Sequence, residues 1–550
     1  MRKWNLPMVR SAAVLATLAV ACTACSTGGS GPVRDAGPPR PGGTLTYGVH
    51  REATCIDPHV SAGDIVGELQ RNVFDSLVAQ KTDGTFAPWL ATAWQISDDS
   101  REYTFTLRRD VRFFDGRPFD AAAVQANFEH IVSPKTKSQY AASLLGPYAG
   151  TDVLDEYTVR VRFKSPNVPF LQAASTAYLG FYSPAVLAEH PDDLCAGGRF
   201  AVGSGPFREV EVRRGQGIDF VRNDEYRWPP ANAGHTGPAY LERLTVRVLT
   251  EDAVRTGSLR GGQVDVISDT PPTEIADLRR DGDFQLVNRN SPGVPYTYFF
   301  NVSKEPFSDI RARRAVGAAV DLDGIVKSVY FGEYPRAYAP LSPTTPGYDR
   351  AAEGRAGYDV ATANRLLDEL GYTGRDAQGY RTRDGHRFSI GLPYASNLIR
   401  ESRDVVAQAV QQELKKVGIE LRLEPVDYGT YTNLLKRNEY EMTGGSWGRS
   451  DPDVLATLYQ SDRDARKGGS NTGQVHDAGV DALLAQGRAG TDPARRYGFY
   501  QQAQQLILDE AYGLPVYVYN SNYAAASRVH DFTLDANGWS KFYDTWVESK

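Results

Sequence analysis

The chain has 550 residues, of which 41% are hydrophobic and 23% are charged, and its formal net charge is −6 at pH 7. This length exceeds what one hydrophobic core supports, so two or three domains are expected. The negative charge argues against a nucleic-acid partner. The eight histidines are scattered without metal-ligand spacing, so neither a metal nor a cofactor is expected.

The N-terminal segment has the pattern of an export signal. Basic residues precede a short apolar run from Ser11 to Ala21, which is too short to span a bilayer. Small residues and Cys22 follow, an order that resembles the bacterial lipobox, in which the cysteine is acylated after cleavage. We predict a lipoprotein signal peptide over 1–21 with lipidation at Cys22, or alternatively at Cys25. Residues 22–42, rich in Gly, Pro and Ser, are interpreted as a flexible tether.

Beyond the tether, the chain shows the periodicities of both helices and strands. Asp120 is a good N-cap for one of the helices. Apolar spacing and turn residues predict, in chain order, a strand at 43–48, helices over 63–77 and 88–94, strands at 103–108 and 111–114, helices over 121–131 and 405–417, and a strand at 419–423.

Two cysteines remain in the body of the chain, Cys55 and Cys195. An even number of cysteines in an exported protein favours a disulfide, which would tie an early loop to a much later one. Two buried free thiols are the alternative interpretation.

One stretch, Tyr440–Asp453, combines glycines with a lone tryptophan and an Asp-Pro turn. Gly444 and its neighbouring glycines allow a close approach of the backbone, and the flat indole of Trp447 suits the wall of a pocket for a small solute. An ordinary alternative is a buried tryptophan in a strand-to-helix loop, because Asp451-Pro452-Asp453 is also a common helix start.

Several blocks occur in a recognisable order: residues 77–124, Gly203–Phe207, Asn223–Trp228, Pro306–Asp321, Tyr358–Tyr372 and Ser446–Pro452. In this order they resemble the extracytoplasmic solute-binding proteins of peptide-type ABC importers, the family of oligopeptide-, dipeptide- and nickel-binding lipoproteins. The resemblance covers roughly residue 43 to the C-terminus.

The resemblance implies an α/β protein with a two-lobed periplasmic-binding-protein-like fold of the class II type and an extra domain inserted in lobe I. The implied segments are 43–91 for lobe I, 92–199 for the extra domain, 200–291 for lobe I again, 292–510 for lobe II, and 511–550 for the return to lobe I.

The resemblance also implies that a solute is bound between the lobes. The matching pocket positions are Ala62, Gly63 and Asp64 from lobe I, and Tyr298, Tyr428, Trp447, Gly448, Arg449, Ser450 and Asp451 from lobe II. For Tyr298 and Tyr428, core packing is an equally good interpretation. Asp64 supplies a carboxylate where binders of longer peptides need not have one.

Two departures from the family pattern concern the ends of a peptide. Such binders usually place an aspartate three residues after the pocket tryptophan to hold the ammonium group, whereas this chain has Ser450 there, followed by Asp451. A basic residue that would receive the carboxylate is replaced by Leu435, with Lys436 and Arg437 just beyond it. A peptide therefore remains the leading ligand, with a metal chelate, an opine or a sugar as alternatives.

The implied partners are a small solute, the permease and ATPase subunits of an importer, and the membrane through a lipid anchor, with the protein monomeric and outside the cytoplasm. A sensor without transport uses the same fold. An exported hydrolase is disfavoured, because Ser204 lies in no Gly-x-Ser-x-Gly elbow and no Ser/His/Asp arrangement can be assembled. No enzymatic activity is expected.

Overall fold

The sheets of the folded chain collect strands from distant parts of the sequence. The computed structural model describes residues 37–355 and 357–548, and Pro38–Lys550 forms one compact unit. Its main sheets have seven and four strands, and smaller sheets accompany them. The N-terminal positions predicted to be a signal peptide and lipidation site lie outside the described residues.

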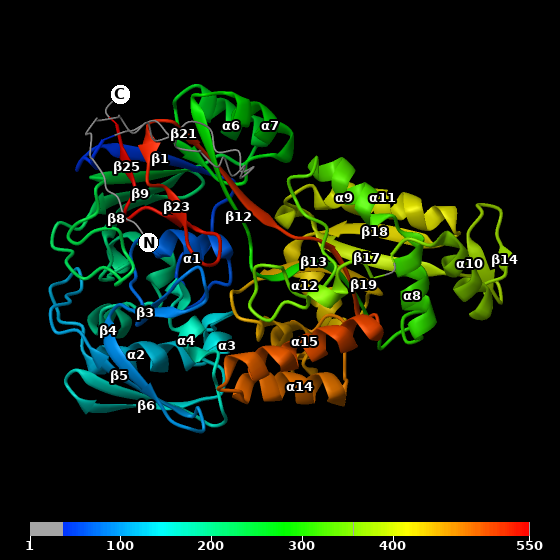
Figure 1. Ribbon diagram of the computed structural model, residues 1–550, viewed down its shortest axis with the longest axis horizontal. Coiled ribbons are helices and arrows are strands. Elements are labelled where there is room, and N and C mark those ends of the chain that lie inside the picture. Colours follow the sequence, from blue (N-terminus) through cyan, green and yellow to red (C-terminus); the bar gives the residue numbers. More distant parts are fainter. Residues whose placement is uncertain (1–36, 356, 549–550) are drawn as a thin grey trace, which may run out of the picture. The chain divides into compact units, whose positions relative to one another are not determined.

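The seven-stranded sheet, which with its helices we call lobe I, has the order β12-β21-β11-β1-β10-β9-β8. β1 runs parallel to both of its neighbours, and the side chains of Leu45 and Tyr47 on it are fully buried. In Figure 1 this sheet joins blue, green and red strands. Its strands are β1 (Thr44–Val49), β8 (Phe207–Arg213), β9 (Gly217–Arg222), β10 (Arg243–Val248), β11 (Val266–Ile267), β12 (Phe284–Asn290) and β21 (Asn520–Ala526). The helices are α1 (Asp64–Gln70), α6 (Asp252–Arg260) and α7 (Pro272–Arg280), so α1 is shorter than the predicted helix over 63–77.

The antiparallel sheet β4-β5-β7-β6 lies in the segment expected to be an extra domain, which we call the inserted domain. As predicted, Asp120 caps α2, because its carboxylate accepts a hydrogen bond from Ala123 N at 2.8 Å. The helix predicted over 88–94 is wrong: β4 forms there because it pairs with β5, with Trp94 opposite Phe105. The strands are β4 (Ala91–Ile96), β5 (Glu102–Leu107), β6 (Tyr148–Asp155) and β7 (Thr158–Phe163), and the helices α2 (Ala121–Val132), α3 (Ala141–Leu145), α4 (Phe170–Ala173) and α5 (Pro184–Glu189). The strand expected at 111–114 is reduced to one isolated bridge.

Lobe II is built on the sheet β19-β13-β20 and the parallel pair β17-β18. Because β20 pairs with β13, the chain stays in the sheet of lobe II as far as Tyr517. The main strands are β13 (Gly293–Phe300), β17 (Ser389–Ala395), β18 (Glu420–Val426), β19 (Met442–Gly448) and β20 (Gly513–Tyr517). The helices are α8 (Ile310–Ala319), α9 (Leu322–Tyr330), α10 (Val360–Glu369), α11 (Arg403–Lys416), α12 (Tyr428–Arg437), α13 (Val454–Tyr459), α14 (Ala478–Ala489) and α15 (Pro493–Asp509).

Short strands complete the fold at the periphery of these bodies. They are β2 (Val78–Gln80), β3 (Phe86–Pro88), β14 (Gly374–Arg375), β15 (Arg381–Arg383), β16 (His386–Arg387), β22 (Val529–His530), β23 (Thr533–Leu534), β24 (Ser540–Lys541) and β25 (Trp546–Val547). The strand predicted at 419–423 and the helix predicted over 405–417 correspond to β18 and α11.

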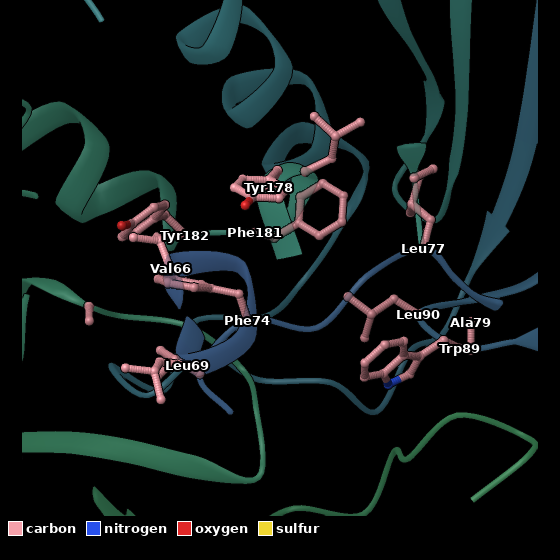
Figure 2. Packing of buried hydrophobic residues seen from close by; sticks show 14 of the residues in the cluster. Val66, Leu69, Phe74, Leu77, Ala79, Trp89, Leu90, Tyr178, Phe181 and Tyr182 are labelled. Carbon is pink, nitrogen blue, oxygen red and sulfur yellow. The ribbon is translucent and has the colours of Figure 1, made fainter. Parts of the chain in front are cut away.

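Lobe I and the inserted domain share one hydrophobic core, whereas lobe II has separate cores of its own. Figure 2 shows part of the shared core, where Phe74 of lobe I lies beside Tyr182 of the inserted domain, with ring centroids 4.3 Å apart. A disulfide joins Cys55 to Cys195 across the same boundary, with Cα atoms 4.4 Å apart. The inserted domain is therefore fastened to lobe I by packing and by a covalent bond.

A pair of histidines, one buried and one partly buried, also lies where the inserted domain meets lobe I. His59 is fully buried; its Nδ1 is 3.1 Å from Nδ1 of His130 on α2, and its Nε2 is 2.9 Å from the carbonyl oxygen of Gly180. Burial lowers the pKa of His59 to about 4. Burial and the neighbouring His59 lower the pKa of His130 to about 4 as well.

These pKa shifts predict a loss of stability as the pH falls from about 6.5 to 4. Over that range the unfolded histidines bind protons and the folded ones do not, so His59 alone costs on the order of 3 kcal/mol by pH 4. Glu68, Asp75 and Glu209 have opposite shifts, because burial raises the pKa of each to about 7. The measurement is therefore comparative: between pH 7 and 4.5 the melting temperature of wild type should fall more than that of His130→Gln. A parallel fall in both proteins would contradict the prediction.

Candidate functional site

The loop before α11 carries the charged side chains that extend from lobe II to lobe I. Glu401 and Ser402 have φ values of 56° and 54°, a left-handed conformation that is uncommon for residues other than glycine. This turn ends the loop, and α11 begins at Arg403. As a result, Arg400 and Arg403 both contact the side chain of Glu401.

A chain of ion pairs crosses between the two lobes through this loop. In lobe I, Asp64 at the start of α1 pairs with Arg51 through one oxygen and accepts a hydrogen bond from Nη1 of Arg400 through the other, at 2.7 Å. In lobe II, Glu401 is 2.8 Å from Nε of Arg400 and 3.0 Å from Nη2 of Arg403. Burial alone would raise the pKa of Asp64, but the charges of Arg51 and Arg400 outweigh it and hold that pKa well below its ordinary value. Asp64 is therefore ionised and shared between two guanidinium groups.

A second acidic group of lobe I lies next to this chain of ion pairs. Oδ2 of Asp269 is 2.6 Å from Nδ1 of His50, and its Oδ1 accepts a hydrogen bond from the hydroxyl of Tyr519 at 2.8 Å. The guanidinium of Arg400 lies over the ring of Tyr519, 5.3 Å from its centroid. Burial opposes ionisation of Asp269, but the charge of His50 prevails and lowers its pKa below the ordinary value.

A cavity of about 170 Å³ in lobe II adjoins the same loop. At the edge of this cavity, the guanidinium of Arg403 lies over the ring of Tyr296, 4.6 Å from the ring centroid. Gly444 is also part of the wall, and a Cβ there would collide with the Tyr296 hydroxyl, so the close backbone approach expected of this glycine is present. Tyr394 and Tyr431 line the cavity as well. These aromatic walls can surround an apolar or aromatic group of a solute.

Trp447, at the end of β19, contacts both lobes. Its partly buried side chain packs against the shared core of lobe I and the inserted domain and also against a core cluster of lobe II. Its ring meets that of Tyr140 edge to face, with centroids 6.1 Å apart. Trp447 is therefore placed in the surface where the lobes meet, as expected of a wall residue.

The residues that follow Trp447 divide into two groups. Nε of Arg449 donates to the Gln172 side chain of the inserted domain at 3.0 Å, and the hydroxyl of Ser450 donates to the side chain of Gln80 in lobe I. Asp451 has a different role, because Nη2 of Arg496 lies 2.7 and 3.0 Å from its two oxygens. Asp451 is thus held in a buried ion pair within lobe II.

The remaining predicted pocket residues lie in several environments. Ala62 and Gly63 precede α1, and the Gly63 carbonyl accepts a hydrogen bond from Tyr178 at 2.8 Å. Tyr298 is fully buried in the core of lobe II, whereas Tyr428 is 51% exposed at the start of α12. Gly448 ends β19 opposite Gly293 of β13 and is exposed. The structure thus brings Asp64, Trp447, Arg449 and Ser450 to the interlobe surface, and for Tyr298 and Asp451 it favours structural roles.

Sequence analysis missed the arginines of this surface, Arg51, Arg400 and Arg403, together with their partner Glu401. A signal was present in the run Arg400-Glu401-Ser402-Arg403 directly before the predicted helix over 405–417. The described part of the chain contains no group of three or more His, Cys, Asp or Glu side chains placed to hold a metal ion. None of its helices combines the length and the apolarity needed to cross a bilayer.

Comparison with known proteins identifies the family of the chain. The family model described as "Bacterial extracellular solute-binding proteins, family 5 Middle" matches residues 85–469. The probable D,D-dipeptide-binding periplasmic protein DdpA of Escherichia coli (strain K12) is 28% identical over 492 residues, which cover 88% of this chain and 89% of the relative. Protein XP55 of Streptomyces lividans is 30% identical over 548 residues, 97% of this chain and 94% of the relative.

Solved structures show the same fold over nearly the whole chain. NikA from Brucella suis in complex with Fe(III)-EDTA has a TM-score of 0.79 at 25% identity and covers 92% of this chain and 100% of its own. The oligopeptide-binding protein AppA from Bacillus subtilis, in complex with a nonapeptide, has a TM-score of 0.80 at 21% identity, with 93% and 100% covered. The two-lobed α/β fold is confirmed. The chain belongs to the bacterial extracellular solute-binding proteins of family 5, the peptide-type binding components of ABC importers, which bind substrates and are not enzymes.

Proposed function

We propose that the chain captures a small solute, a peptide, between lobes I and II and delivers it to the permease and ATPase subunits of an ABC importer. The observation that carries the proposal is the contact from Arg400 of lobe II to Asp64 of lobe I, beside the aromatic cavity of lobe II. A solute that entered here would be enclosed by charged groups of both lobes and by aromatic walls, which is the composition of a ligand site.

Relatives support a peptide as the solute. They include the probable D,D-dipeptide-binding protein and a di/tripeptide-binding protein of Pseudomonas aeruginosa. A non-peptide solute is the second candidate, favoured by Ser450 in the position where peptide binders usually have an aspartate. Relatives with other ligands are named as well, among them a heme-binding protein and a binding protein in complex with agropinic acid.

In the proposed mechanism the solute shifts the population toward the closed arrangement of the lobes. Such a shift requires the solute to bind the closed state more tightly than the open one. The groups that supply this difference are those of lobe II that reach lobe I, above all Arg400 and Trp447. The protein works as a monomer in this mechanism, because one chain carries both sides of the site.

We expect Trp447→Ala to weaken solute binding by about 2–4 kcal/mol, the range for a buried aromatic anchor. Native mass spectrometry of protein purified from its own cells identifies the solute, and calorimetric titration then compares wild type with Trp447→Ala. The free energy of unfolding should fall by less than the roughly 3–5 kcal/mol typical of a core tryptophan. Unchanged affinity with a large drop in melting temperature would show that Trp447 is a core residue. Absence of any co-purifying or titratable solute would contradict solute capture.

A lipid anchor at Cys22, or alternatively at Cys25, completes the proposal and places the protein on the outer side of the cell membrane. It rests on the export signal and the Gly-, Pro- and Ser-rich segment after it, which would let the body move above the bilayer. Detergent partitioning of Cys22→Ala, Cys25→Ala and the double variant checks it. The double variant should leave the detergent phase; if it still partitions there, the anchor is wrong.

A further inference from the structure

We infer that the cleft selects its solute by an anionic group, held between Arg51 of lobe I and Arg400 of lobe II, and that a free ammonium group on the solute is not required. The inference rests on the proposed function, since it names the class of solute for the same cleft. For a peptide, this means that the cleft binds the carboxylate end and also accepts a peptide whose amino end is blocked.

The charges of the interlobe ion pairs do not balance. The five linked groups are the guanidiniums of Arg51, Arg400 and Arg403 and the carboxylates of Asp64 and Glu401, and together they carry one positive charge. The neighbouring carboxylate of Asp269 is paired separately, with His50. A cationic group would add to this excess, whereas an anionic group would cancel it. Because charges interact more strongly in a cleft from which water is excluded, closure of the lobes amplifies this preference.

Exposure shows where an anion can enter. The side chain of Glu401 is only 2% exposed, so its charge is committed to the arginines of lobe II. The side chains of Arg51 and Asp64 are 30% and 35% exposed, and that of Arg400 is 19% exposed. The accessible end of the cluster is therefore the place where the two lobes each contribute a guanidinium to a single carboxylate.

A hydrogen-bond donor without a partner lies at the same end. Nε of Arg51 is buried and has no hydrogen-bond partner among the described residues. Buried polar groups in folded proteins are normally paired, so this donor is available to an acceptor on the solute. A guanidinium presents its donors in a fixed fork that matches a carboxylate, which is the acceptor that the charge excess also favours.

Three of the acidic groups that could hold an ammonium already have partners in the structure. Both oxygens of Asp64 contact arginines, and Asp451 is paired with Arg496. Asp269 is bound by His50 and Tyr519. Each of these carboxylates thus has a cationic or hydrogen-bonded partner on both of its oxygens.

Asp404 is the remaining acid to test, because it lines the lobe II cavity and forms no ion pair with another described residue. It lies in the first turn of α11, where the helix terminus itself stabilises a carboxylate. The helix terminus therefore explains why a charged carboxylate is stable at Asp404 without a ligand. Replacing Asp404 tests whether it holds an ammonium group.

The experiment titrates one series of dipeptides in three forms, free, N-acetylated and C-amidated, into wild type, Arg400→Gln and Asp404→Asn. For wild type, amidation should weaken binding about 10-fold or more, the effect of losing a charged hydrogen-bonded pair. Acetylation should change affinity less than about 3-fold.

In Arg400→Gln the free and amidated forms should bind almost equally, while Asp404→Asn keeps the preference for the free acid. Arg400→Lys, which keeps the charge without the fork, should restore part of the preference, and melting temperatures verify that each variant is folded.

Two outcomes would overturn the inference in distinguishable ways. If acetylation costs more than amidation, and the cost disappears in Asp404→Asn, then Asp404 holds an ammonium and the inference fails while peptide capture stands. If none of the three forms binds to wild type, the peptide assignment itself fails, and this account of its recognition fails with it.

Discussion

The hydrogen-bonded ion pair between Arg400 and Asp64 connects the two lobes, and the proposed closed arrangement depends on it. It joins the loop before α11 in lobe II to the first residue of α1 in lobe I. The left-handed turn at Glu401 and Ser402 directs the loop, and Glu401 holds both Arg400 and Arg403 in place. Neither lobe alone contains the complete cluster of charges, so recognition of a charged solute requires that the lobes come together.

The way the cores are divided makes such a movement possible without repacking. Lobe I and the inserted domain form one core and are also joined by the disulfide Cys55–Cys195, whereas lobe II has cores of its own. Across the boundary lie polar side chains, such as Arg449 against Gln172, and the partly buried Trp447. Contacts of this kind can form and separate while each body stays intact, which is the behaviour of hinge closure.

Sequence reasoning succeeded where a local pattern determines structure. The capped helix α2 and the amphipathic helix α11 were predicted because their caps and periodicity are local features. The predicted helix over 88–94 failed because a short apolar run does not identify its own partner, and pairing with β5 made it a strand. At the site, Trp447 was proposed from its glycine-rich stretch and Asp64 through the family resemblance, whereas Arg400 was not proposed. Its role depends on a contact with Asp64, which lies 336 residues away in the sequence. No periodicity or spacing in the sequence reveals such a contact.

The central claim, that a solute closes the lobes, is tested most directly by measuring the distance between them. Nitroxide labels at Val254→Cys on α6 of lobe I and Gln412→Cys on α11 of lobe II occupy exposed helical positions, in a background with Cys22→Ala and Cys25→Ala. Electron–electron resonance should give a broad distribution without solute and a shorter, narrower one at saturation. An identical distribution with and without saturating solute would contradict the account.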